Sequence, residues 1–423
     1  MTITLLELND LELRLWREDD TVVSEPGWAL LTEPPVVGQM ALDQARLQPR
    51  LTSCQFWHAL NTDPMPGATQ AARHHADLAY LQLTALKGAA PNTEFAVCVP
   101  GHYDRTDLSL LLGLMAAADL SVKALIDPGL LLARCAASTT PNLLYLDAGL
   151  HAVTLTVIQQ GPQLHRSSCR IAHSAGYLNL IDRLANSSAS ALVRKSRFDP
   201  LQQASTEQQL FKQLLQPDHP LDGLGRGLIS LHHDGAQYDV QLSETDLRAA
   251  TADLVPDVVT AIRAATNGPT EVLISHRAHR LPGLIESLSL VPGLVTQSLT
   301  STSLLEAFVD FTPELAASAA HNQLIYSLAN PSRKTETNTE PASRDLSVSH
   351  VVQHGVAINI ATFSETTSQD FELALDSTSS RWQLIPGSAS IALNEQPLTE
   401  PRFIKPGDAV LTGNQAFQFI QVR

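Results

Sequence analysis

The sequence lacks several features that would assign it to a class of protein at once. No apolar run approaches the roughly eighteen residues that a membrane-spanning helix needs. The first residues, MTITLLELND, carry acidic side chains where a secretory signal peptide would carry basic ones. We therefore expect a cytoplasmic protein without membrane insertion. Cysteines are few, widely separated and without metal-ligand spacing, which predicts reduced, buried thiols at Cys54, Cys98, Cys135 and Cys169.

Positive charge is also scarce. The 423 residues include 28 Lys and Arg against 43 Asp and Glu, which gives a net charge of −15. Nucleic acid and anionic membranes would repel such a surface on average, so we expect partners to be other proteins. One short basic cluster, Arg194–Arg197, is interpreted as a solvated loop. No Walker loop, Ser-His-Asp arrangement or zinc motif occurs at the required spacing.

The stretch that organises the chain is NLLYLDAGLHAVTLTVIQQG, residues 142–161. Its apolar alternation predicts a strand, a turn with Asp147 and Gly149, and a second strand. An Asp-x-Gly turn allows a backbone to approach a phosphate, although a plain hairpin is the alternative. The preceding residues, 94–134, predict strand, helix, strand and helix, the order expected of a layered α/β domain.

Short motifs in this order resemble the actin, heat-shock-protein-70 chaperone and sugar-kinase superfamily, and most closely the chaperone nucleotide-binding domain. The motifs are Val99-Pro100, Ile126-Asp127-Pro128 and Asp147-Ala148-Gly149, and the resemblance covers about residues 1–330. It implies an α/β, two-lobed actin-like ATPase fold, which is a duplicated ribonuclease-H-like domain. Lobe I would span 1–141 and lobe II 142–329.

The resemblance also implies a nucleotide site. Its first phosphate loop would contain Asn9 and Asp10, with magnesium held by Asp10 and Asp147. The remaining nucleotide-binding positions would be Asp147, Gly149, Gly176, Ser275 and His276.

Two of the expected loops depart from the superfamily pattern. Bulky Leu11, Glu12 and Leu13 follow Asp10 where small residues would let the backbone surround a phosphate, and Glu12 would repel one. The adenosine turn has SHRAHR, residues 275–280, in place of glycines. We interpret this turn as solvated, with a new anion site as the alternative. No cofactor is therefore expected, and ATP with magnesium belongs to the alternative function below.

Local signals predict other elements along the chain. Strands are expected at 2–8 and 11–17, and a hairpin around Asp234-Gly235. Helices are expected at 38–47 and 198–216, at the sequence that begins with His74 and His75, and at 243–266. The last would be one long helix, capped by Ser243 and Asp246 and kinked at Pro256.

The C-terminal part predicts a separate module. Residues 330–345 are polar and rich in proline, which indicates a linker. Residues 346–423 contain short strand patterns, including AINIATF (357–363), without a helix signal, which predicts a small all-β sandwich. The end of this module resembles a forkhead-associated domain. The resemblance rests on Asn394, Gly407, Asp408 and Gly413, but the phosphothreonine-reading elements are not evident.

The function predicted from these patterns is a non-catalytic, chaperone-like or actin-like scaffold or adaptor, a pseudo-ATPase in a cytoplasmic protein assembly. The alternative is a weak magnesium-dependent ATPase that uses the two retained acids, Asp10 and Asp147. A third hypothesis, a sugar-kinase-like enzyme, lacks any recognisable substrate loop.

Overall fold

The computed structural model divides the chain into two compact units, Met1–Lys334, which we call the body, and Thr335–Arg423, the C-terminal unit. We describe each by itself. The structure describes residues 3–17, 21–89, 93–136, 138, 140, 142–215, 227–266, 268–331, 348–353, 356–365, 370–376, 381–387, 391–394, 396–412 and 415–420. The predicted linker lies outside the described residues except for Asn330 and Pro331, and so does Gly413.

The first sheet of the body has six strands. Its order is β16 (Gln323–Ile325), β8 (Ser121–Ile126), β7 (Glu94–Cys98), β1 (Ile3–Glu7), β2 (Leu13–Trp16) and β3 (Val22–Glu25). The strands β1, β7, β8 and β16 run parallel, whereas β1, β2 and β3 are successively antiparallel. The strands predicted at 2–8 and 11–17 are thus confirmed as β1 and β2.

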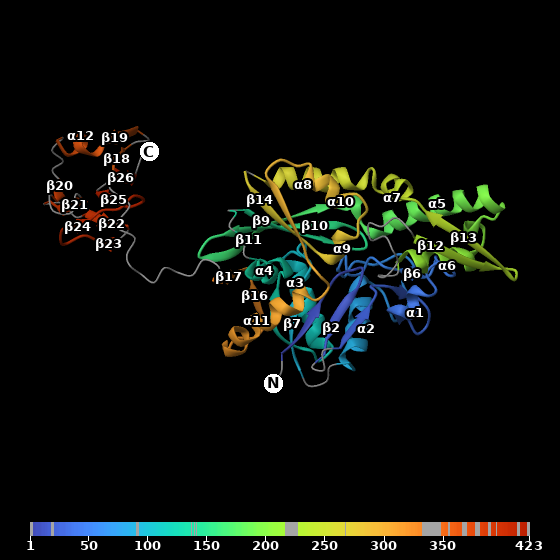
Figure 1. Cartoon of the computed structure of the whole chain (residues 1–423). Helices are drawn as coiled ribbons and strands as arrows, with labels where there is room; N and C mark the ends of the chain where they lie inside the picture. The colour runs from blue at the N-terminus through green and yellow to red at the C-terminus, as the bar shows by residue number, and fades with distance from the viewer. Residues whose placement is uncertain are drawn as a thin grey trace. The chain divides into compact units, whose positions relative to one another are not determined.

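The second sheet also has six strands. Its order is β15 (Leu294–Ser298), β14 (Thr270–Ile274), β9 (Asn142–Ala148), β10 (Val153–Gln160), β11 (Gln163–Ala172) and β17 (Ser327–Ala329). Here β9, β14 and β15 are parallel, and β9, β10 and β11 are successively antiparallel. The organising stretch at 142–161 is therefore a central hairpin of this sheet (Figure 1).

The two sheets repeat one topology. In each, the first three strands form an antiparallel meander, and the next two add in parallel beside the first. The repeat makes the β1–β2 turn equivalent to the β9–β10 turn. Mixed sheets with helices are the α/β class that the βαβα pattern predicts.

Each sheet has one face covered by its own hydrophobic core. Against the first sheet lie α2 (His75–Lys87) and α3 (Arg105–Ala117). The second sheet packs against a larger group, part of which Figure 1 shows along the sheet. This group comprises α5 (Tyr177–Ser196), α6 (Ala204–Leu215), α7 (Glu244–Thr251), α8 (Leu254–Ala265), α10 (Leu284–Ser289), and the hairpin of β12 (Gly227–His233) and β13 (Ala236–Leu242).

A third core joins the two sheets. It is built around α4 (Pro128–Cys135) and α11 (Ser303–Ala317), which pack on each other. Leu5 of the first sheet and Leu143 of the second belong to this core, while their neighbours Leu6 and Leu144 face the other two. Alternation at period two thus buries both faces of each sheet. After β15 the chain returns to the first sheet through α11 and β16, and β17 then adds to the second sheet beside β11.

Smaller elements complete the body. A three-stranded sheet contains β4 (Ala29–Leu30), β5 (Val36–Val37) and β6 (Thr52–Ser53). The helix predicted at 38–47 is only α1 (Gln39–Leu42). The helix predicted at 198–216 is a 3-10 turn at Pro200–Gln202 followed by α6. The Asp234-Gly235 hairpin is confirmed, with both residues at positive φ as such a tight turn requires.

Two further predictions were wrong, one of a helix and one of a turn. The long helix at 243–266 is two helices, α7 and α8, although Ser243 and Asp246 form the predicted capping box. Pro256 explains the break, because its ring would collide with the carbonyl of Ala252 in a continuous helix, whereas it fits in the first turn of α8. The turn at 275–280 contains a short helix, α9 (His276–His279), which Ser275 caps by accepting a hydrogen bond from the Ala278 N–H.

The cysteine prediction was partly wrong. All four are free thiols, but only Cys98 is buried; Cys54 and Cys169 are partly exposed and Cys135 is exposed. In the part of the chain that the structure describes, no helix is both long and apolar enough to cross a bilayer.

The C-terminal unit has two sheets that share one core. One contains β19 (Val356–Asn359), β18 (His350–Gln353), β26 (Gln415–Ile420), β25 (Ala409–Thr412), β22 (Ile391–Leu393) and β23 (Gln396–Pro397). The other contains β20 (Phe371–Asp376), β21 (Arg381–Pro386) and β24 (Arg402–Phe403).

The absence of a helix from this unit was predicted wrongly. Within AINIATF the strand ends at Asn359, and α12 (Ile360–Glu365) follows. The Asn359 side chain accepts a hydrogen bond from the Ala361 N–H at 3.0 Å, which caps a helix that the apolar alternation concealed.

Candidate functional site

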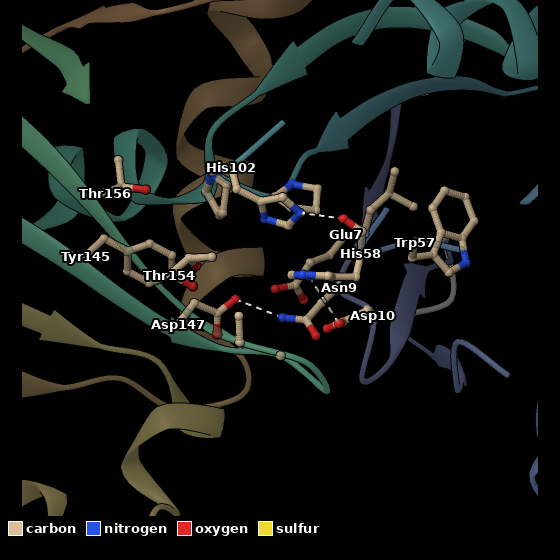
Figure 2. A pocket seen from close by; sticks show the side chains of 16 residues that line it. Glu7, Asn9, Asp10, Trp57, His58, His102, Tyr145, Asp147, Thr154 and Thr156 are labelled. Carbon is tan, nitrogen blue, oxygen red and sulfur yellow. Dashed lines mark hydrogen bonds and ion pairs between the residues drawn. The ribbon is translucent and has the colours of Figure 1, made fainter. Parts of the chain in front are cut away.

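A small, largely enclosed cavity lies where the carboxyl ends of β1, β7, β8 and β9 meet, the edge of parallel strands at which ligands usually bind. Its volume is about 30 Å³, room for about two water molecules. Figure 2 shows the side chains around it. The lining includes Glu7, Asn9, Asp10, His58, His102, Tyr145, Asp147, Gly149, Thr154 and Thr156.

The Asp10 carboxylate closes one side of this cavity. It accepts hydrogen bonds from the backbone N–H groups of Leu150 at 2.7 Å and His151 at 3.1 Å. The His151 ring nitrogen Nδ1 lies 2.8 Å from the same carboxylate. Burial favours the protonated acid, but the hydrogen bond and charge of His151 outweigh it and lower the pKa of Asp10. The Asp10 carboxylate, from the β1–β2 turn, therefore accepts hydrogen bonds from the backbone N–H groups of the equivalent β9–β10 turn.

Glycines allow this close approach. A Cβ on Gly149 would overlap the Asp10 Oδ1, and one on Gly176 would overlap the backbone of His151. Gly176 also precedes α5, whose first N–H groups, on Tyr177 and Leu178, donate to the carbonyls of Gly149 and Leu150. Both predicted glycines therefore shape the β9–β10 turn.

Asn9 and Asp147 connect the two sheets directly. The Asn9 Nδ2 donates to the Asp147 Oδ2 at 3.0 Å and to the Ala148 carbonyl at 3.3 Å (Figure 2). The Asn9 Oδ1 accepts from the Leu11 N–H at 2.9 Å, which fixes the amide orientation. Asn9 lies two residues after the end of β1, and Asp147 is the penultimate residue of β9.

Arg277, in α9, is the residue that sequence reasoning misplaced. It was interpreted as part of a solvated turn, but its side chain is only 1% exposed. Its guanidinium donates to both Asp147 oxygens, from Nε at 3.1 Å and from Nη2 at 2.9 Å. The same group also binds Glu7, and Glu12 at 3.4 Å.

The buried carboxylates around Arg277 explain why its charged side chain can be buried. Burial alone would lower its pKa, yet the charges of Asp147 and Glu7 prevail and raise that pKa well above the ordinary value. Burial raises the pKa of Glu12, but the His276 hydrogen bond and the nearby arginines lower it further than burial raises it. A cation with three carboxylate partners suits the anion-site alternative poorly, because those partners already neutralise it.

Ser275 and His276 lie apart from the small cavity. Ser275 caps α9, and its N–H donates to the Leu146 carbonyl at 2.9 Å. The His276 Nε2 lies 3.3 Å from the Glu12 Oε1. His276 and Glu12 both line a second, more open cavity of about 360 Å³. Of the seven predicted positions, the small cavity gathers Asn9, Asp10, Asp147 and Gly149.

The Ile126-Asp127-Pro128 motif has a local role. The Asp127 Oδ1 accepts from the Gly129 N–H at 2.8 Å at the start of α4, and its Oδ2 accepts from the Arg166 Nε at 2.9 Å. Burial raises the pKa of Asp127, and Arg166 offsets part of the effect. Arg166 also donates to the Gly101 carbonyl, which connects β11 of the second sheet to the loop after β7.

Sequence reasoning also missed a histidine cluster beside the cavity. The rings of His102, His151 and His173 lie 5.0, 5.2 and 6.3 Å from the ring of His58. Burial lowers the pKa of His58 to about 4, and Asp10 offsets only part of this. Motif spacing along the sequence was the signal considered, and it cannot find side chains that come from three loops and a 3-10 turn.

No protein-family model matches this chain, and a search of curated proteins also found no match.

Proposed function

We propose that the body is a degenerate member of the actin, heat-shock-protein-70 and sugar-kinase superfamily that works as a non-catalytic scaffold or adaptor for other proteins. The fold part of this proposal is supported by the duplicated topology of the two sheets. The superfamily resemblance of the short motifs places the nucleotide between them. The pseudo-ATPase part rests on how the polar groups at that position are used.

The observation that carries the proposal is the Asp10 carboxylate on the N–H groups of Leu150 and His151. In the proposed fold these N–H groups belong to the second phosphate loop, so a protein anion stands in the place of a phosphate. Hydrogen bonds to a charged group contribute about 1.5–3 kcal/mol each, and a nucleotide would have to displace them. A cavity of about 30 Å³ also leaves no room for a triphosphate.

Arg277 supports the same conclusion from the other side. The superfamily hypothesis gives Asp147 a magnesium ion, but its two oxygens accept from the Arg277 guanidinium. A protein cation thus stands where the metal would be. In the proposed fold, Asp10 therefore takes the position of a phosphate and Arg277 takes the position of the magnesium ion.

The test is calorimetric titration of the full chain with ATP and ADP, with and without Mg²⁺. We expect no saturable binding with a Kd below about 1 mM. That Kd corresponds to a binding free energy of about −4 kcal/mol. Micromolar binding that Asp147→Asn abolishes and Asp119→Asn retains would overturn the proposal. Asp119 is a fair control because its side chain is 84% exposed.

Micromolar binding that depends on Asp147 would favour the alternative function, a weak magnesium-dependent ATPase. One observation favours this alternative: the two acids it needs, Asp10 and Asp147, line the same cavity. Hydrolysis of ATP by the full chain, lost in Asp10→Asn, would establish it.

We further propose that the C-terminal unit is a forkhead-associated-like interaction module. Asn394 and Asp408 support it: the Asn394 Nδ2 donates to Asp408 at 2.9 Å, and the Asn394 Oδ1 accepts from the Ala409 N–H at 2.9 Å. This holds the turn before β25 against the end of β22. Partner capture by the full chain, compared with a chain that ends at Asn330, tests the proposal. Equal recovery by both would place the binding surface on the body.

A further inference from the structure

We propose that Asp10, His58 and His151 bind a divalent transition metal ion, of which Zn²⁺ fits best. Each residue offers one ligand atom, and the three atoms all lie within 4.8 Å of one another. This site is distinct from the magnesium pair inferred from the superfamily, because it uses imidazoles and leaves Asp147 to Arg277.

Two of the three distances between ligand atoms are close to those of a metal site. The Asp10 Oδ2 lies 2.8 Å from the His151 Nδ1 and 3.8 Å from the His58 Nδ1. Zinc binds such atoms at about 2.0–2.2 Å in a tetrahedron, which separates neighbouring ligands by about 3.3–3.5 Å. Shifts of well under an ångström in these two distances would match that geometry. Figure 2 shows His58 and Asp10 facing each other.

The ligand types select the metal. Two imidazole nitrogens and one carboxylate oxygen are a donor set for zinc, nickel or copper, whereas magnesium prefers oxygen ligands alone. Three protein ligands leave a fourth position open, and His58 and Asp10 line the cavity that could hold a water molecule there. The site would therefore hold the metal ion with three protein ligands and one open coordination position.

Two neighbours serve as supporting groups. The His151 Nε2 lies 3.6 Å from the Cys54 Sγ, a contact that orients the ring so that Nδ1 faces Asp10. The Nδ1 of His102 is buried and has no hydrogen-bond partner among the described residues. A buried polar atom without a partner calls for an explanation, and an ion or its bound water beside the cavity supplies one.

The proposed metal would join the two halves of the body. Asp10 follows β1 of the first sheet and His58 lies in the loop after β6, whereas His151 belongs to the β9–β10 turn of the second sheet. A ligand that binds only the folded chain stabilises it in proportion to its concentration and affinity. Zinc should therefore raise the unfolding temperature of the whole body, independently of any nucleotide.

The test uses the full chain, purified with a chelator and then dialysed. We expect calorimetry with ZnCl₂ to give one tight site per chain, and Co²⁺ to give the visible absorption of tetrahedral cobalt. His58→Ala and His151→Ala should each weaken zinc binding by about tenfold or more. The control is His165→Ala, an exposed histidine on β11 outside the cluster, which should bind zinc as the unchanged chain does.

Several results would overturn the proposal. They are no zinc binding by the unchanged chain, equal affinity in the two ligand variants, or an equal loss in His165→Ala. If an alanine variant does not fold, His58→Gln and His151→Gln replace it, and folding is checked by circular dichroism without metal. A rise in unfolding temperature with Mg²⁺ as large as with Zn²⁺ would also contradict the assignment.

Discussion

Asp10 and His151 contact each other through both backbone and side chain: the Asp10 Oδ2 accepts from the His151 N–H at 3.1 Å and lies 2.8 Å from its ring Nδ1. The two residues are 141 positions apart and belong to equivalent turns of the two sheets. An internal anion thus holds the β9–β10 turn, which would be a phosphate-binding turn in the proposed fold.

Replacing the carboxylate of Asp10 should weaken the body. Asp10→Asn keeps the size of the side chain but removes the charge that the Leu150 and His151 N–H groups face. We expect the free energy of unfolding to fall by about 1–3 kcal/mol, because hydrogen bonds to charged groups are stronger than neutral ones. Urea denaturation measures it. An unchanged midpoint would show that the carboxylate charge contributes nothing there.

Arg277→Met should be strongly destabilising. It leaves Asp147 buried without its cation and Glu7 with only Arg14, at 3.6 Å, and breaking a buried pair in this way costs about 3–5 kcal/mol. The triple variant with Asp147→Asn and Glu7→Gln should recover much of the loss, because it removes the uncompensated charges. Arg263→Met, at an exposed position, is the control and should change stability by about 0.5 kcal/mol or less. No recovery in the triple variant would refute the charge argument.

Gly149→Ala should lower stability because the new Cβ would overlap the Asp10 Oδ1. We expect a loss of about 1–3 kcal/mol, the usual range for overpacking. Gly113→Ala is a matched control in α3, where nothing lies within 4 Å of the added Cβ. That substitution should stabilise by about 0.5–1 kcal/mol through helix propensity. Thermal unfolding of both variants should therefore shift in opposite directions.

Acid should remove the stabilisation that Glu12 provides. Its folded pKa lies below the ordinary 4.5, in spite of burial, because of its hydrogen bond to His276 and the charge of Arg277. The stabilisation is therefore complete above about pH 4.5 and is lost as the pH falls below it. The unfolding temperatures of the unchanged chain and Glu12→Gln should differ at pH 7, and the difference should begin to shrink below pH 4.5 and shrink further as the pH falls towards the folded pKa. A difference that stays constant from pH 7 down to the most acidic pH at which both chains still fold would contradict the assignment.

Local chemistry in the sequence was sufficient to predict much of the fold. Apolar alternation located β1, β2, β9 and β10, and Asp234-Gly235 located its hairpin, because these signals act between residues close in the chain. Apolar alternation failed where a single side chain decides the start of a helix, as Asn359 does for α12 and Pro256 does for α8. The superfamily resemblance placed Asp10, Asp147 and Gly149 in one site, and the structure gathers them around one cavity.

The sequence by itself determined the strands, the two hairpin turns and the acids in them, since each depends on a few neighbouring residues. Only the tertiary structure decided what those acids contact. Asp10 meets His58 and His151, and Asp147 meets Arg277, because the repeated topology turns the ends of two sheets toward each other. Charges and imidazoles that contact each other from distant parts of the chain then share one buried volume, where low solvation makes each of them take a partner.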